Sequence, residues 1–102
     1  MSAQMSFADF LASRGDPAPP AGLAPPVRAL WHEARGDWEE AHTLAQAAGG
    51  PEGAWVHAYL HRKEGDKSNA AYWYARAGQP VATGALGAEW EQIARALLGI
   101  AD

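Results

Sequence analysis

Apolar residues recur at intervals of three and four along most of this chain, and no stretch alternates between apolar and polar residues. Intervals of three and four place side chains on one face of an α-helix, whereas alternation is typical of a strand. Within residues 85–99, Trp90, Ile93, Ala94 and Leu97 share one such face. The pattern therefore predicts an all-α fold that ends in an amphipathic capping helix.

A short helix is predicted at the start of the chain, within residues 1–15. Phe7 and Phe10 have helical spacing, and Ser6 precedes Asp9 by three residues, as in a capping box. Five of the seven prolines fall in the next segment, which cannot form a regular helix and favours extended geometry. We therefore expect a proline-rich strap over residues 16–26, with the two phenylalanines docked on the body.

The body contains an internal repeat. Residues 30–37 match residues 59–66 at a shift of 29 positions. In each copy a glycine follows an apolar helical pattern and can end that helix, and the next residue is an aspartate that can cap another. A later Gly-x-Pro sequence closes each copy. The repeat predicts two antiparallel helical hairpins, over residues 27–51 and 54–80, stacked on each other and covered by the capping helix.

The length and the composition predict a single helical domain over residues 1–102, because domains of about 100–150 residues are the most common. Alanine is abundant, and five tryptophans and three tyrosines provide the large side chains. Alanine lets helices approach closely, and each aromatic ring can bury roughly 150–250 Å². Two hairpins are fewer than the roughly three repeats that usually sustain a solenoid. We therefore expect support from the terminal segments or from a homodimer.

The second copy resembles the tetratricopeptide pattern. Gly65, Asp66, Ala70, Tyr74 and Ala77 have its spacing, in which Gly-Asp is followed by alanine, an aromatic residue and alanine. The first copy has an alanine in the aromatic position, and the unit is 29 residues long rather than about 34. The resemblance implies a tetratricopeptide-like arrangement of the hairpins. The string His-Ala-Tyr-Leu-His-Arg-Lys-Glu-Gly-Asp is also similar to a group of small tetratricopeptide-like proteins of unknown function, and this similarity implies no activity.

Charge and composition exclude several classes of function. Eight basic and twelve acidic residues give a net charge of −4, which is unsuited to nucleic acid. The chain has no cysteine for a disulfide or a thiolate metal site, and no apolar run long enough for a membrane span. We find no signal peptide, so a cytoplasmic location is expected. No nucleophile motif or phosphate-binding loop occurs, which favours a non-enzymatic protein without a cofactor.

The second hairpin concentrates aromatic, arginine and amide side chains, and its first helix would line the concave groove of a tetratricopeptide-like array. Such side chains are typical of interaction hot spots. The candidate surface consists of Trp55, Tyr59, Arg62, Asn69, Tyr72, Trp73 and Arg76. We therefore expect a module that binds a protein or peptide. The alternative is that these aromatic rings fill a core poor in leucine.

The histidines suggest an alternative function, small-molecule or metal binding, with or without catalysis. His57 and His61 are four residues apart on a predicted helix, and Glu64 lies nearly one turn further along. A zinc site needs three or four ligands, however, and His61, like His32 in the first copy, can instead pack at a helix seam. His42 follows Glu39 and Glu40 by three and two residues and could therefore titrate near neutral pH, but a position on the solvated surface is expected.

Overall fold

The computed structural model describes residues 5–99, and in that range the chain forms six α-helices and one 3₁₀ helix but no strand. The all-α prediction is therefore confirmed. The elements are α1 (Phe7–Ala12), η1 (Ser13–Gly15), α2 (Pro25–Ala34), α3 (Trp38–Ala48), α4 (Gly50–Glu64), α5 (Lys67–Ala77) and α6 (Leu86–Leu98). Within the described part of the chain, no helix combines the length and apolarity needed to cross a membrane.

The two copies of the repeat have the same local structure. The side chains of Asp37 and Asp66 each accept a hydrogen bond from the backbone N–H three residues later, at 3.1 and 3.2 Å, and so cap α3 and α5. The backbone N–H of each aspartate donates to a carbonyl five residues earlier, that of His32 or His61, at 3.0 and 2.9 Å. The sequence repeat is thus matched by a repeat of backbone hydrogen bonds.

Proline marks the beginning of two helices in this fold. Gly49 follows α3, but α4 starts at the next residue, with Pro51 in its first turn. Pro51 therefore opens the second helical pair, whereas the sequence pattern had it closing the first. In the same way, α2 starts at Pro25, so the strap is shorter than predicted. Proline is favoured at the first turn because its missing N–H would have no partner inside the helix.

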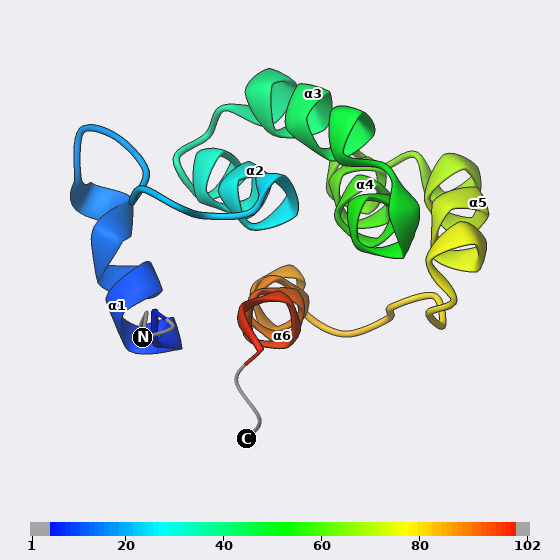
Figure 1. Cartoon of the computed structure of the whole chain (residues 1–102). Coiled ribbons are helices and arrows are strands. Elements are labelled where there is room, and N and C mark those ends of the chain that lie inside the picture. The colour runs from blue at the N-terminus through cyan, green and yellow to red at the C-terminus, as the bar shows by residue number, and fades with distance from the viewer. Residues whose placement is uncertain (1–4, 100–102) are drawn as a thin grey trace.

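Neighbouring helices pack in sequence order, and α6 then returns to cover two of them. Contacts join α2 to α3, α3 to α4 and α4 to α5, and α6 packs against α2, α4 and α1. Figure 1 shows α6 on the side of α2 and α4 that faces away from α3. The first helices of both pairs are therefore covered by the last helix of the chain.

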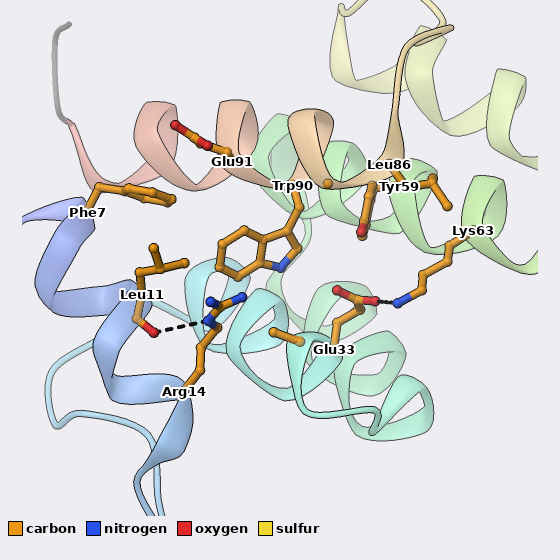
Figure 2. A pocket seen from close by; sticks show the side chains of 11 residues that line it. Phe7, Leu11, Arg14, Glu33, Tyr59, Lys63, Leu86, Trp90 and Glu91 are labelled. Carbon is orange, nitrogen blue, oxygen red and sulfur yellow. Dashed lines mark hydrogen bonds and ion pairs between the residues drawn. The ribbon is translucent and has the colours of Figure 1, made fainter.

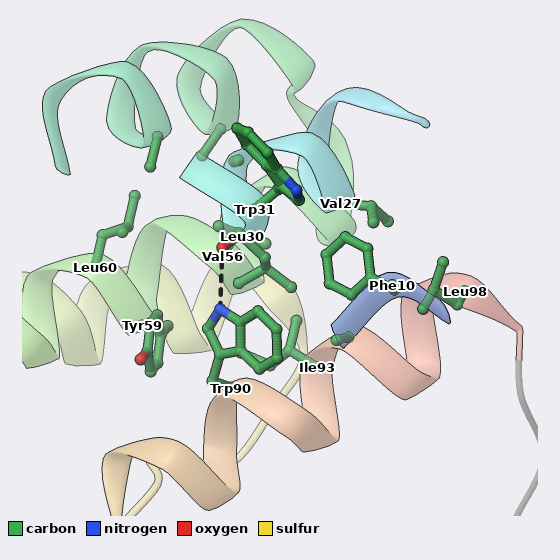
Figure 3. Close-up of a cluster of buried hydrophobic side chains, with 14 of the residues drawn as sticks. Phe10, Val27, Leu30, Trp31, Val56, Tyr59, Leu60, Trp90, Ile93 and Leu98 are labelled. Carbon is green, nitrogen blue, oxygen red and sulfur yellow. Dashed lines mark hydrogen bonds between the residues drawn. The ribbon is translucent and has the colours of Figure 1, made fainter. Parts of the chain in front are cut away.

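The main core lies between α1, α2, α4 and α6, and Figure 3 shows its large side chains. Phe10 is fully buried and stacks on Trp90, with ring centroids 5.6 Å apart. The indole Nε1 of Trp90 donates to the carbonyl of Leu30 at 3.1 Å, and that of Trp31 donates to Ser13 at the same distance. The N-terminal segment therefore docks on the body through buried aromatic contacts and a hydrogen bond.

Candidate metal centre

Three histidines from two neighbouring helices converge on one point. His57 and His61 are one turn apart on α4, and His42 faces them from α3. One ring nitrogen from each lies within 4.8 Å of the other two. The chain brings them together because α3 and α4 are joined at Gly49 and pack along their lengths.

The three imidazole rings form a compact cluster. The ring centroid of His42 lies 4.6 Å from that of His57 and 5.4 Å from that of His61, both edge to face. The rings of His57 and His61 are 4.8 Å apart and nearly parallel. Tetrahedral zinc, with bonds of about 2.0–2.1 Å, places its nitrogen ligands about 3.4 Å apart. The nitrogens, within 4.8 Å of one another, would therefore have to move closer together to reach bonding distance of one ion.

One imidazole is already oriented by a carboxylate. Nδ1 of His61 lies 2.9 Å from Oε1 of Glu64, with which it forms a hydrogen bond. This bond engages Nδ1 and leaves Nε2 of His61 for an ion. Histidine ligands commonly donate their other ring N–H to a carboxylate, which fixes the tautomer and makes the ligand nitrogen more basic. Glu64 therefore acts on His61 and is not placed as a third ligand beside it.

The cluster favours neutral imidazoles. Burial lowers the pKa of His57 to about 4, and the nearby His42 and His61 add to this effect. Burial and the neighbouring His61 also lower the pKa of His42, against an opposing influence from Glu64 and Glu39. Neutral imidazole has a free lone pair, so these two side chains are in the form that binds a metal ion.

Two tryptophans form the walls of the cluster. Trp73 of α5 stacks on His57, with ring centroids 3.9 Å apart, and Trp38 of α3 stacks on His42 at 4.9 Å. His57 and His61 are buried, whereas His42 is half-buried. The aromatic walls limit ring rotation, and the exposed side of His42 gives an ion a route from solvent.

The sequence pattern identified only part of this cluster. His57 and His61 lie together as their spacing predicts, but Glu64 is a hydrogen-bond partner, and the prediction of His42 as a solvated surface residue is not met. The sequence could have pointed to His42 through its position midway along α3, because α3 directly precedes α4 in the chain and consecutive helices often pack together. His32, the counterpart of His61 in the first copy, packs its ring edge-on to Trp31 at 5.0 Å instead.

Three residues of the predicted binding surface do not face an open groove, because α6 and the loop before it cover them. Tyr59 is buried in the main core. Arg62 donates to Oε1 of Glu89 on α6 at 2.8 Å and to the carbonyl of Gly84. Trp55 is half-buried and borders a hollow lined by the loop between α5 and α6.

The other four residues of that surface belong to α5. The amide of Asn69 donates to the carboxylate of Asp66 at 3.4 Å, at the start of the helix. Tyr72 is 54% exposed, its ring lies 5.1 Å from that of Trp73, and the guanidinium of Arg76 lies 5.7 Å from the Tyr72 ring. Only Tyr72, Trp73 and Arg76 therefore form a shared accessible patch.

A second hollow, of about 310 Å³, lies between α1, α2, α4 and α6 (Figure 2). Phe7 and Trp90 form part of its wall, and an ion pair between Glu33 and Lys63 lies at one side. Arg14 is placed over the Trp90 ring, 5.4 Å from its centroid. The charged groups of this hollow thus already pair with each other or with protein groups, so the histidine cluster is the stronger candidate site.

A comparison of the chain with protein-family models, with curated proteins and with solved structures gave no match.

Proposed function

We propose that this protein binds one divalent transition-metal ion through His42, His57 and His61. The observation that supports the proposal best is the convergence of three imidazole nitrogens within 4.8 Å of one another. Both the lowered pKa of His57 and the hydrogen bond between Nδ1 of His61 and the Glu64 carboxylate favour imidazoles that can bind an ion.

The ligand chemistry narrows the choice of ion. Imidazole suits zinc, copper, nickel and iron, whereas magnesium and calcium prefer oxygen ligands. The chain has no cysteine, so thiolate does not contribute. Three protein ligands leave at least one coordination position open, an arrangement typical of zinc sites that accept water or a substrate. We therefore expect a zinc-type site with an open position.

Metal binding would also stabilise the fold, because the ion joins α3 to α4. A ligand that binds only the folded state adds about 2.7 kcal/mol when its concentration is 100 times the dissociation constant. Thermal unfolding of chelator-treated protein, with and without added Zn²⁺, tests the proposal. We expect a higher melting temperature with Zn²⁺, little change with Mg²⁺, and no zinc effect in a His42→Gln, His57→Gln double variant. No zinc effect on the wild-type protein would contradict the proposal.

Protein recognition is a second candidate function, favoured by the exposure of Tyr72 beside Arg76 on α5. We propose a second copy of this chain as the partner, since a domain with only two helical pairs gains most from added buried surface. Sedimentation over a range of concentrations tests for a dimer, and Tyr72→Ala should weaken it. A wild-type protein that stays monomeric throughout would exclude this role.

The repeat also supports a proposal about the fold: the α2–α3 and α4–α5 pairs are two copies of one tetratricopeptide-like hairpin. The shared capping bonds of Asp37 and Asp66 support it, as do the buried alanines Ala41 and Ala70 at equivalent positions. In tetratricopeptide-like arrays the first helix of each hairpin lines the groove that binds a partner. In this chain α6 packs on those helices, α2 and α4, which argues against a peptide groove on α4.

A further inference from the structure

A pocket of about 320 Å³ is lined by the last turn of α4, by α5 and by the loop that joins α5 to α6 (Figure 1). Its apolar part consists of Ala70 and Tyr74 from α5 and of Val81 and Ala82 from the loop. Ala70 and Tyr74 are buried, whereas 55% of Val81 is exposed. Small-molecule sites of about 300–1,000 Å³ are typically apolar with a few polar groups, and this pocket has that composition.

The charged groups of this pocket are mainly positive. Arg62 and Lys67 line it, and no carboxylate does so among the described residues. Glu89 offsets one of the two charges, because it accepts a hydrogen bond from Arg62 at 2.8 Å. Lys67 forms no ion pair within residues 5–99, and the Asp66 carboxylate beside it accepts from the backbone and the amide of Asn69 instead. The charge of Lys67 therefore remains for a ligand with one negative charge.

The Arg62 guanidinium has a further donor that a ligand can reach. Its two terminal nitrogens donate to Glu89 and to the carbonyl of Gly84, whereas its Nε makes no hydrogen bond within residues 5–99. No buried side-chain nitrogen or oxygen in that range lacks a partner, so this Nε is accessible from outside the protein. The side chain as a whole is only 18% exposed. The bonds to Glu89 and Gly84 thus fix the guanidinium at the pocket wall and leave one donor unused.

We infer that this pocket binds a small monocarboxylate with a short alkyl tail. The carboxylate accepts hydrogen bonds from Arg62 and Lys67, and the hydroxyl of Thr83, which also lines the pocket, is a further donor. Hydrogen bonds between charged groups are roughly twice as strong as those between neutral ones. The tail lies against the apolar wall formed by Val81 and Ala82. None of the three clustered histidines lines this pocket, so binding here needs no metal ion.

NMR titration with sodium acetate, butyrate and hexanoate tests the inference, with a chelator present so that no metal ion contributes. The backbone amide signals of Ala70, Val81 and Thr83 should shift most, which locates the ligand. Each CH₂ group that the pocket buries should raise the affinity about fourfold, so hexanoate should bind more tightly than butyrate, and butyrate more tightly than acetate. 1-Hexanol has the tail without the charge and should bind at least about tenfold more weakly than hexanoate.

Two variants test the residues that line the pocket. Lys67→Gln removes a positive charge, and Val81→Asp places a carboxylate in the apolar wall. Each should weaken hexanoate binding about tenfold, because a charge-assisted contact is lost or a like charge is added. Both side chains are exposed, so the melting temperature without ligand should stay close to that of the wild type. Arg28→Gln removes the same charge on α2, outside the pocket, and should retain the wild-type affinity.

Three results would overturn the inference. The first is a wild-type protein that binds no hexanoate. The second is equal affinity for acetate, butyrate and hexanoate, because an ion that only pairs with a surface charge gains nothing from a tail. The third is hexanoate binding that neither Lys67→Gln nor Val81→Asp weakens, which would place the ligand elsewhere. Each of these results would leave the proposed metal site intact, since the chelator removes any metal ion from the titration.

Discussion

Nδ1 of His61 and Oε1 of Glu64 lie 2.9 Å apart on neighbouring turns of α4. The imidazole is buried, whereas 42% of the glutamate side chain is exposed. The carboxylate thus reaches from solvent to a ring inside the histidine cluster. The sequence spacing suggested His57, His61 and Glu64 as three ligands. The geometry instead makes Glu64 the residue that orients the His61 ring.

Removal of this carboxylate should weaken metal binding without abolishing it. Loss of an orienting partner typically reduces metal affinity 10- to 100-fold, so we expect about that decrease for Glu64→Gln in a zinc competition assay with a chromophoric chelator. Glu40→Gln, which removes the same charge from the exposed first turn of α3, is the matched control. Equal zinc affinities for Glu64→Gln and Glu40→Gln would show that Glu64 affects zinc binding only through its charge, and would contradict its role in orienting His61.

The metal-free protein should lose stability in mild acid. The pKa of His57 is about 4 in the folded protein and near 6.5 in an unfolded chain. Above both values neither state is protonated, and between them only the unfolded chain binds the proton. The free energy of unfolding should therefore decrease as the pH falls from about 6.5 to about 4. Urea unfolding with a chelator present, over this range, measures the slope.

A variant pair isolates the contribution of the cluster to this acid sensitivity. His57→Gln should show a smaller decrease than the wild type, because it removes the buried imidazole. His32→Gln, which changes a histidine on α2 outside the cluster, should keep the wild-type slope. An unchanged slope in His57→Gln would refute the assignment of this pH dependence to the buried ring.

A buried polar network should make Glu89 essential to the fold. Its carboxylate accepts from Arg62 at 2.8 Å and from the hydroxyl of Tyr74, whose pKa is raised by burial and by this hydrogen bond. Glu89→Ala leaves the largely buried guanidinium of Arg62 without its carboxylate and the Tyr74 hydroxyl without its acceptor, although Arg62 keeps its bond to the carbonyl of Gly84. We therefore expect the free energy of unfolding to fall by about 3–5 kcal/mol in chemical unfolding. Glu91→Ala, an exposed change on the same helix, should cost under about 1 kcal/mol. Similar losses of unfolding free energy in Glu89→Ala and Glu91→Ala would contradict a stabilising role of the Arg62–Glu89–Tyr74 network.

The N-terminal segment should contribute measurably to stability. Phe10 is completely buried against Trp90, and removal of a buried phenylalanine ring typically costs about 3–5 kcal/mol. Phe10→Ala should therefore lower the urea midpoint strongly, whereas Asp16→Ala in the exposed strap should have little effect. A midpoint unchanged by Phe10→Ala would show that α1 is not docked in solution.

The helices were predictable because their boundaries depend on local chemistry. Asp37 and Asp66 cap helices as their spacing from the preceding glycines indicates, and Phe10 is buried as its helical spacing suggests. The start of α4 was misplaced because Pro51 can either follow a helix or open one. Local sequence does not distinguish these two uses.

The site was less predictable because it depends on contacts between helices. Tyr59 and Arg62 have the spacing of a surface stripe, but α6 packs over them, and the partner of Arg62 is 27 residues away. His42 joins the cluster only because α3 packs on α4. Adjacent glutamates in the sequence suggested a solvated position, whereas the structure places the ring between Trp38 and His57.

The most direct test is calorimetric titration of chelator-treated, dialysed protein with Zn²⁺ at neutral pH. The proposed site predicts one ion per chain, with an affinity at least about tenfold weaker in each of His42→Gln, His57→Gln and His61→Gln. His32→Gln should bind as the wild type does. A wild-type protein that takes up no zinc, or three cluster variants that bind as tightly as the wild type, would contradict the metal centre.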